Sequence, residues 1–378
     1  MTVSTCARRD AAILPWAAAT ALLALCGSAS GQATFTRIQS LDEANRWTRV
    51  TGISSDGMTV VGRSMTDKGT FEGFLWTNQL GAQGVGSLLH NTSAAEAISG
   101  DGKVVVGSSG RHSFQRTEAF RWTQAEQIES LGIGSSMSTA YGASHDGSVI
   151  VGQYDEFPER AFRITPSGMT DLGDLGGGRA SARDVSHDGE TAVGWSEVNF
   201  DRTEAFVWTP EAGMKGLGTL GGSASWAWAV SCDGGTAVGS SRVDNAFEDG
   251  HAFMWNQTDG MVDLGAMDDL FSVAWDVSEG GNVVVGEAYS APFGPTRAFI
   301  WDRQNGMVDL NEYAKDVLKL SIDGWQLQSA KAVSDDGLFI AGDGLSPEGE
   351  YAGWVIQVPS PGTLVVMGAA MVMMRRRR

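Results

Sequence analysis

A short motif recurs seven times along this chain, and its regular spacing constrains the fold more than any other feature. Each copy has an apolar residue and serine, one variable residue, aspartate and glycine, followed by an apolar run that ends in glycine. The motif aspartates, with glycine in the sixth copy, are Asp56, Asp101, Asp146, Asp188, Asp233, Gly280 and Asp336. They are separated by 45, 45, 42, 45, 47 and 56 residues. This spacing indicates a repeat architecture in which each unit packs against its neighbours.

The Asp-Gly pair of each motif predicts a two-residue β-hairpin turn, because glycine accepts a positive φ and aspartate tolerates one. An alternative is that the aspartates bind metal ions. Each of them, however, stands alone in its turn, without the alternating Asp/Asn ligands of a calcium loop. We therefore interpret them as turn residues.

Two further strands follow the hairpin in most copies. The third strand ends in a Phe-x-Trp pattern, as at Phe206 and Trp208, and the fourth begins with Gly-Met, as at Gly213 and Met214. Alternation along a strand puts Phe and Trp on one face, so we interpret them as core residues between stacked sheets rather than as an aromatic platform for carbohydrate. Four strands per repeat is the content of a propeller blade.

The seventh repeat, residues 330–357, has no fourth strand of its own, while the apolar segment 34–41 belongs to no repeat. We predict that these two segments pair, so that one blade is drawn from both ends of the domain and no sheet edge stays open. The sequence thus predicts an all-β domain over residues 32–357: a seven-bladed β-propeller closed by an N-terminal strand.

Two segments, 217–223 (Leu-Gly-Thr-Leu-Gly-Gly-Ser) and 251–255 (His-Ala-Phe-Met-Trp), resemble the bacterial extracellular repeat family named HAF after its His-Ala-Phe tripeptide. The resemblance covers residues 50 to about 357. It implies an extracellular repeat architecture and no particular activity. The histidine of the tripeptide occurs only at His251, and the other copies have Glu72, Glu118, Arg160, Glu204, Arg297 and Tyr351. A position that tolerates either charge is not expected to be a catalytic or metal site.

The N-terminal residues 1–31 have the three parts of a secretory signal peptide: Arg8 and Arg9, an apolar stretch, and a run of small residues. We predict export through the secretion machinery. Of the three cysteines only Cys232 lies beyond this segment, so no internal disulfide is expected. The net charge of −18 disfavours nucleic acid as a partner.

The C-terminal residues 358–378 form a proline-containing segment, an apolar run and a basic end. They resemble the PEP-CTERM sorting signal read by exosortase, although Ser360 replaces the glutamate of the motif. The residues of the predicted signal are Val358, Pro359, Pro361, Gly362, Arg375, Arg376, Arg377 and Arg378. The resemblance implies passage through the inner membrane to the cell surface or extracellular matrix. A permanent membrane anchor uses the same parts, so cleavage and retention both stay open.

The long loops between second and third strands are expected to share one face of the propeller. Variable loops on a rigid scaffold commonly carry binding sites. The candidate binding residues on this face are Tyr154, Phe157, Trp195, Phe200, Phe247, Tyr289 and Phe293. Simple solvated loops are the alternative.

The sequence favours a secreted, surface-associated, non-catalytic repeat protein that is structural or binds a glycan, a protein or calcium. The alternative is a propeller-type carbohydrate-active hydrolase or lyase. No paired carboxylates, nucleophile elbow or metal-ligand spacing is present, and His90, His112, His145, His187 and His251 are scattered singly. We therefore predict no catalytic, cofactor-binding or metal-binding residues and no cofactor.

Overall fold

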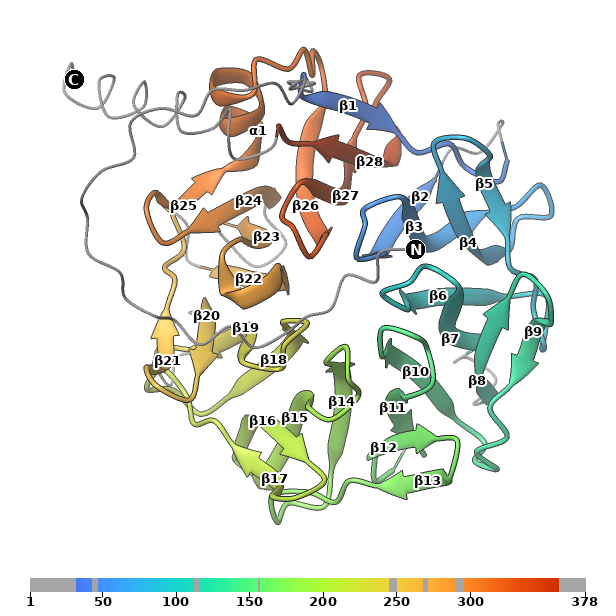
Figure 1. Ribbon diagram of the computed structural model, residues 1–378, viewed down its shortest axis with the longest axis vertical. Helices are drawn as coiled ribbons and strands as arrows, with labels where there is room; N and C mark the ends of the chain where they lie inside the picture. Colours follow the sequence, from blue (N-terminus) through green and yellow to red (C-terminus); the bar gives the residue numbers. More distant parts are fainter. Residues whose placement is uncertain are drawn as a thin grey trace, which may run out of the picture.

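The structure is a computed structural model that describes residues 32–42, 47–111, 116–155, 157–244, 250–267, 271–289 and 296–359. These residues form an all-β fold of five four-stranded sheets and one eight-stranded sheet. The eight-stranded sheet joins two four-stranded units through a single parallel pair, Gly250 with Phe271. Figure 1 shows the sheets arranged side by side around a central axis.

Each sheet runs from an inner strand near the axis to an outer strand at the rim (Figure 1). The inner strands are β2 (Thr48–Ile53), β6 (Ser93–Ile98), β10 (Ser138–Ala143), β14 (Ala180–Val185), β18 (Ser225–Val230), β22 (Phe271–Val277) and β26 (Gln326–Val333). The second strands are β3 (Thr59–Met65), β7 (Val104–Arg111), β11 (Ile150–Tyr154), β15 (Ala192–Asn199), β19 (Thr236–Arg242), β23 (Val284–Tyr289) and β27 (Phe339–Leu345).

The third strands are β4 (Phe71–Thr77), β8 (Arg116–Thr123), β12 (Arg160–Thr165), β16 (Arg202–Thr209), β20 (Gly250–Asn256), β24 (Thr296–Asp302) and β28 (Tyr351–Gln357). The outer strands are β5 (Gly81–Gly84), β9 (Gln127–Ser130), β13 (Gly168–Asp171), β17 (Gly213–Gly216), β21 (Gly260–Asp263), β25 (Gly306–Asp309) and β1 (Thr34–Arg37). Short helical turns occupy Glu279–Gly281 (η2), Leu310–Glu312 (α1) and Tyr313–Val317 (η3).

The N-terminal strand β1 pairs antiparallel with β28, from Thr34 opposite Gln357 to Arg37 opposite Trp354. Ile38 extends this pairing, because its N–H donates to the carbonyl of Gly353 at 2.9 Å, and its side chain is buried. The strand is shorter than the apolar segment 34–41 that the sequence marked.

The motif turns differ in detail from the prediction. In the first copy the N–H of Gly57 donates to the carbonyl of Ser54, and the N–H of Ser54 donates to the carbonyl of Thr59, so the loop holds four residues instead of two. Asp56 Oδ1 accepts hydrogen bonds from Ser54 Oγ at 2.6 Å and from the N–H of Met58 at 2.9 Å. The aspartate therefore caps the turn, as expected for a turn residue rather than a metal ligand.

A β-bulge interrupts every inner strand, and the motif glycine on the second strand makes room for it. In β18 the bulge residue is Trp228, because Ala227 pairs with Gly239 and Ala229 with Val238. A Cβ on Gly239 would overlap the carbonyl oxygen of Trp226. Equivalent bulges occur in the other six inner strands. The glycine that ends each motif is therefore required by close backbone approach.

The core lies between neighbouring sheets. Its repeated members are fully buried aromatic residues on the third strands: Phe74, Phe120, Phe162, Phe206, Phe253, Phe299 and Trp354. The tryptophans two residues further on pack in the same clusters but are less completely enclosed; Trp208 is 8% exposed. The prediction that these aromatic residues fill the core is confirmed.

Candidate axial binding site

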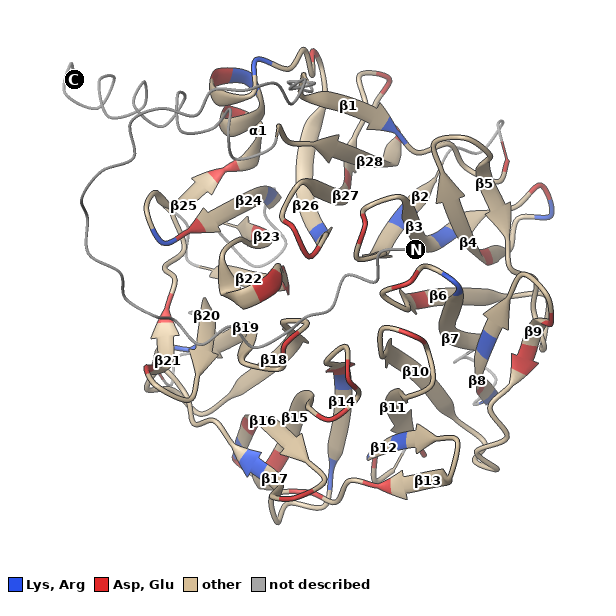
Figure 2. Ribbon diagram, viewed as in Figure 1, with Lys and Arg blue, Asp and Glu red and all other residues tan. Residues whose placement is uncertain are grey.

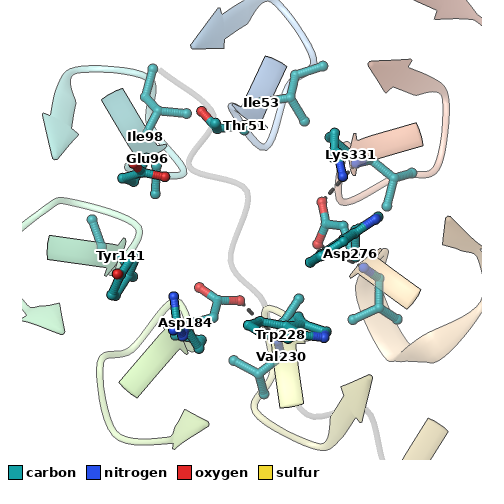
Figure 3. Close-up of a pocket in the computed structure, with 18 of the residues that line it drawn as sticks. Thr51, Ile53, Glu96, Ile98, Tyr141, Asp184, Trp228, Val230, Asp276 and Lys331 are labelled. Carbon is teal, nitrogen blue, oxygen red and sulfur yellow. Dashed lines mark hydrogen bonds between the residues drawn. The ribbon is translucent and has the colours of Figure 1, made fainter. Parts of the chain in front are cut away.

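The seven bulge residues all line a cavity of about 460 Å³ on the axis. A bulge re-aims the side chain of its extra residue, and here that residue faces the axis (Figure 3). These residues, which we call the axial layer, are Thr51, Glu96, Tyr141, Arg183, Trp228, Trp275 and Lys331. Two residues further along each inner strand, toward the motif turns, the side chains are instead small and apolar: Ile53, Ile98, Ala143, Val185, Val230, Val277 and Val333. The axial layer thus combines aromatic, basic and acidic groups above an apolar ring.

Two cations of the axial layer lie against aromatic rings. The guanidinium carbon of Arg183 is 4.1 Å from the ring centroid of Tyr141 and 5.2 Å from that of Trp228. Lys331 Nζ is 3.9 Å from the ring centroid of Trp275 and 3.2 Å from Glu287 Oε2. These contacts hold both cationic side chains in fixed positions on the cavity wall.

Burial raises the pKa of Glu96, although Arg63, Arg183 and Arg49 oppose that shift. All four residues line the cavity. Figure 2 shows that basic segments lie on the inner strands β2, β14 and β26, in a protein whose net charge is −18. The cavity lining therefore holds four cations beside four carboxyl groups, Glu96, Asp184, Asp276 and Asp335, and burial raises the pKa of each of these carboxyl groups.

Two aspartates next to bulge residues connect neighbouring sheets. Asp184 accepts hydrogen bonds from its own sheet at Val185 N–H and from the next sheet at Val230 N–H, at 2.8 and 2.9 Å. Asp276 does the same with the N–H groups of Val277 and Val333, both at 2.8 Å. Burial raises the pKa of Asp184 to about 7 and that of Asp276 to about 8. Each carboxyl group thus joins two neighbouring sheets in the wall of the cavity.

A second set of axial residues comes from the variable position of the seven motifs. We call it the turn ring: Ser55, Gly100, His145, His187, Cys232, Glu279 and Asp335. Backbone hydrogen bonds run around it, for example from His145 N–H to the carbonyl of His187 at 3.1 Å and from Asp335 N–H to the carbonyl of Ser55 at 3.2 Å. Several of its members also line the cavity.

The turn ring corrects the expectation that the histidines are scattered. The rings of His145 and His187 lie 4.7 Å apart, and His187 Nε2 is 3.1 Å from Ser55 Oγ and 3.5 Å from Asp335 Oδ2. Burial, with a smaller effect of His145, lowers the pKa of His187 to about 4, and burial raises the pKa of Asp335 to about 6. The signal for this cluster was available, because all these residues occupy the same place in the repeat.

Five of the seven loop-face candidates lie in the described residues. Phe157 and Trp195 are brought together around Arg179, whose guanidinium carbon is 5.1 and 6.0 Å from their ring centroids. Tyr154 donates a hydrogen bond to Asp171 at 2.9 Å.

Two further loop-face candidates, Phe200 and Tyr289, are described. Phe200 is fully exposed, and Tyr289 stacks on Phe271 at 5.0 Å. Phe247 and Phe293 lie outside the described residues.

Other predicted residues lie away from the axis or outside the described part. His251 pairs with Asp263 at 2.9 Å on the outer part of its sheet, and His112 is not described. Of the predicted sorting signal, only Val358 and Pro359 are described, and both are buried. Residues 1–31 and 360–378, including Pro361, Gly362 and the four arginines, lie outside the described residues. None of the helices described is long and apolar enough to cross a membrane.

The sequence matches no protein-family profile and no curated protein. Among solved structures, the β-propeller domain of the Trilobed protease from Pyrococcus furiosus is similar over 82% of this chain and 94% of that chain, with a TM-score of 0.55 and 9% identity. TolB from Acinetobacter baumannii is similar over 66% of this chain and 62% of its own, with a TM-score of 0.47 and 13% identity. The match therefore spans less than two thirds of the TolB chain. The fold is that of a β-propeller.

Proposed function

We propose that this protein is an exported, surface-associated, non-catalytic binding protein whose ligand occupies the axial cavity of a seven-bladed, closed β-propeller. The observation that carries the proposal is the axial layer. Seven equivalent bulges present Thr, Glu, Tyr, Arg, Trp, Trp and Lys to one cavity, whereas the fold itself requires only that a bulge be present. We infer that the different residues at these equivalent sites contact an asymmetric ligand.

The pairing of β1 with β28 supports the closed ring. It pairs the outer edge of the last sheet with a strand from the other end of the domain. The seam also has a polar contact between sheets, because Asp343 Oδ2 on β27 accepts a hydrogen bond from Val50 N–H on β2 at 3.3 Å. A closed ring would keep the seven members of the axial layer in register.

The chemistry of the wall favours an anionic saccharide. Arg49, Arg63 and Arg183 supply positive charge, Lys331 is paired with Glu287, and Trp228 and Tyr141 supply apolar surface. Arg183 Nε is buried without a hydrogen-bond partner among the described residues, so this group has a donor to offer. A carboxylated or sulfated sugar matches both requirements, because charged-group recognition and packing on flat apolar faces operate together.

A glycan array on the purified protein tests this function. We expect uronic-acid or sulfated glycans to bind and their neutral counterparts to bind at least about 10-fold more weakly. Arg183→Met should abolish the preference for acidic glycans. Arg163→Met is the matched control, because Arg163 also stacks on a tryptophan, Trp208, at 5.7 Å, but lies outside the cavity lining. Equal loss in both variants, or no binding of acidic glycans, would count against the proposal.

The enzyme alternative has one observation in its favour, the proximity of Ser55, His187 and Asp335. In a catalytic triad the carboxylate and the nucleophile contact opposite nitrogens of the imidazole. Here Ser55 Oγ and Asp335 Oδ2 both approach Nε2, at 3.1 and 3.5 Å. The geometry therefore supports a non-catalytic role. Product analysis of the same glycans after incubation separates the alternatives, since released sugar would establish a hydrolase or lyase.

We also propose that the protein is exported and that its C-terminal tail is either cleaved by exosortase or kept as a membrane anchor. Val358 N–H donates to the carbonyl of Leu338 at 2.7 Å, and its side chain belongs to the core. A cut upstream of Val358 would remove a core residue, so we place the processed end at Pro359 to Gly362. Mass spectrometry of the C-terminal peptide from the native host tests this placement. Mainly intact chain ending at Arg378 would favour a permanent anchor instead.

A further inference from the structure

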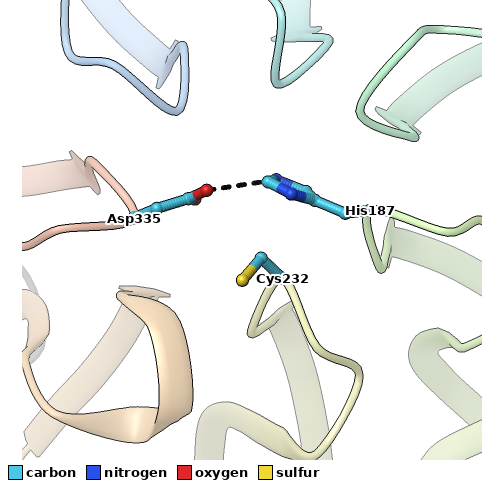
Figure 4. A group of neighbouring side chains, drawn as sticks. All are labelled: His187, Cys232 and Asp335. Atoms are coloured by element: carbon cyan, nitrogen blue, oxygen red, sulfur yellow. Dashed lines mark ion pairs between the residues drawn. The ribbon is translucent and has the colours of Figure 1, made fainter. Parts of the chain in front are cut away.

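Three potential metal ligands from three different sheets converge on the axis. His187 follows β14, Cys232 follows β18 and Asp335 follows β26, and one ligand atom from each lies within 4.8 Å of the other two. Figure 4 shows the side chains of Asp335 and His187 directed toward each other, with Cys232 beside them on its own turn. Whole repeats separate the three residues in the sequence, where they share only their position in the motif.

We propose that His187, Cys232 and Asp335 bind a divalent transition metal of the zinc class in the turn ring. Imidazole nitrogen, thiolate sulfur and carboxylate oxygen are the three donor types that zinc accepts in proteins. Calcium and magnesium require sets of oxygen ligands, which this group does not provide. This inference does not depend on the proposed glycan-binding function.

The proposal assigns the fourth position of a tetrahedral site to His145, whose ring lies 4.7 Å from that of His187. Its Nδ1 atom is buried and has no hydrogen-bond partner among the described residues. The glycine at position 100 leaves space between the two imidazoles: a Cβ there would collide with His145 Nδ1 and lie 3.0 Å from His187 Nε2. A fourth ligand needs a ring nitrogen that is available to the metal, and His145 Nδ1 meets this requirement.

Backbone hydrogen bonds connect the turns that carry His187, Cys232 and His145. His187 N–H donates to the carbonyl of Cys232 at 3.0 Å, and His145 N–H to that of His187 at 3.1 Å. Such support reduces the cost of assembling the site. Metal binding would replace the contact between Ser55 Oγ and His187 Nε2.

Cobalt substitution tests the site directly. The purified full chain is stripped with a chelator and titrated with Co²⁺, then Zn²⁺ is measured by competition. We expect one equivalent of Co²⁺, a thiolate-to-cobalt charge-transfer band in the near ultraviolet, and displacement of the band by Zn²⁺. Absence of a stoichiometric spectrum would overturn the proposal.

Variants assign the ligands. Cys232→Ser should remove the charge-transfer band, and His187→Ala and Asp335→Asn should each weaken Zn²⁺ binding by at least about 10-fold. His251→Gln is the matched control, because His251 pairs with a carboxylate at 2.9 Å away from the axis, and it should leave the spectrum unchanged. A Cys232→Ser protein that keeps the band, with a melting curve like that of the parent, would exclude this site. His145→Ala should weaken binding and change the visible d–d bands; an unchanged spectrum would remove His145 from the ligand set.

Discussion

Two layers of this propeller occupy equivalent strand positions in every repeat, yet their residues behave oppositely. The core layer is the set of fully buried aromatic residues on the third strands. It has phenylalanine at every position except the last, which is tryptophan: Phe74, Phe120, Phe162, Phe206, Phe253, Phe299 and Trp354. The axial layer has six residue types at its seven positions. The first layer fills the same space between sheets each time, so packing selects the same side chain. The second faces an open cavity, where packing selects very little.

This difference separates residues that the fold needs from residues that the fold permits. The bulge and the motif glycine belong to the first group, because the backbone of the inner strand approaches the glycine too closely for a Cβ. The side chain on the bulge belongs to the second. Changes to the core layer should therefore alter stability, and changes to the axial layer should alter binding.

The largest effect should come from removing the strand that covers the seventh member of the core layer. A chain that begins at Asp42 lacks β1 and Ile38, leaving the edge of β28 unpaired beside Trp354. We expect the free energy of unfolding to fall by about 5 kcal/mol or more, or folding to fail, since buried side chains and strand hydrogen bonds are lost together. Thermal melting by circular dichroism measures this. A melting temperature equal to that of the parent would rule out the closure.

The core layer itself gives the next effect. Phe206→Ala should cost about 3–5 kcal/mol, because the ring is fully buried. Trp255→Ala should cost less, since that ring is only half-buried at the end of its strand. Urea denaturation of both variants compares them. A larger loss for Trp255 would mean that the repeated tryptophans, and not the phenylalanines, dominate the core.

The motif glycine should give an intermediate effect. Gly239→Ala places a Cβ against the carbonyl of Trp226 and should cost about 1–3 kcal/mol through strain on the bulge. Gly250→Ala is the control in the same sheet, because its Cβ would meet no atom closer than 3.7 Å. If the two variants melt alike, the close approach at the bulge does not explain the glycine.

Asp276 should make stability depend on pH. Its pKa rises on folding from 3.8 to about 8 because of burial, so the folded protein holds a proton that the unfolded chain releases. The stabilisation is complete below about pH 4 and is lost as the pH rises through 8, with a slope of at most about 1.4 kcal/mol per pH unit. Asp184 should add a weaker effect of the same sign.

Substitution distinguishes the charge of Asp276 from its hydrogen bonds. Asp276→Asn cannot ionise and should flatten the decline between pH 5 and 8, while its single carboxamide oxygen can accept from only one of the N–H groups of Val277 and Val333, which lowers stability by an amount that does not depend on pH. Asp276→Ala leaves both N–H groups without this acceptor and should destabilise the protein at every pH. Melting curves across the pH range provide the measurement, and a decline of the same slope in the Asn variant would show that other groups cause it.

The sequence predicted the repeated part of the molecule and missed the part that differs between repeats. Spacing and alternation identify strands and core phenylalanines, because each copy repeats the same physical requirement. They do not reveal the bulges: the segment around Trp226 and Trp228 reads as regular alternation, and only the pairing of Ala227 and Ala229 with consecutive residues of β19 shows the extra residue. Alignment of the seven motifs could have placed His187, Cys232 and Asp335 at the same position of the repeat. The distances between these residues in space, however, depend on the diameter of the propeller ring, which the motif spacing does not define.

The smallest effect should come from the loop face, where the sequence suggested a binding surface. Phe200 is fully exposed. Phe200→Ala should change the free energy of unfolding by less than about 0.5 kcal/mol, because the ring buries nothing. Phe206→Ala, six residues along the same hairpin, is its natural partner for comparison. If the glycan array is also unchanged by Phe200→Ala but lost in Arg183→Met, binding belongs to the axis. If Phe200→Ala alone abolishes binding while the melting curve stays the same, the loop face is the site after all, and the variety of the axial layer reflects only the freedom of an open cavity.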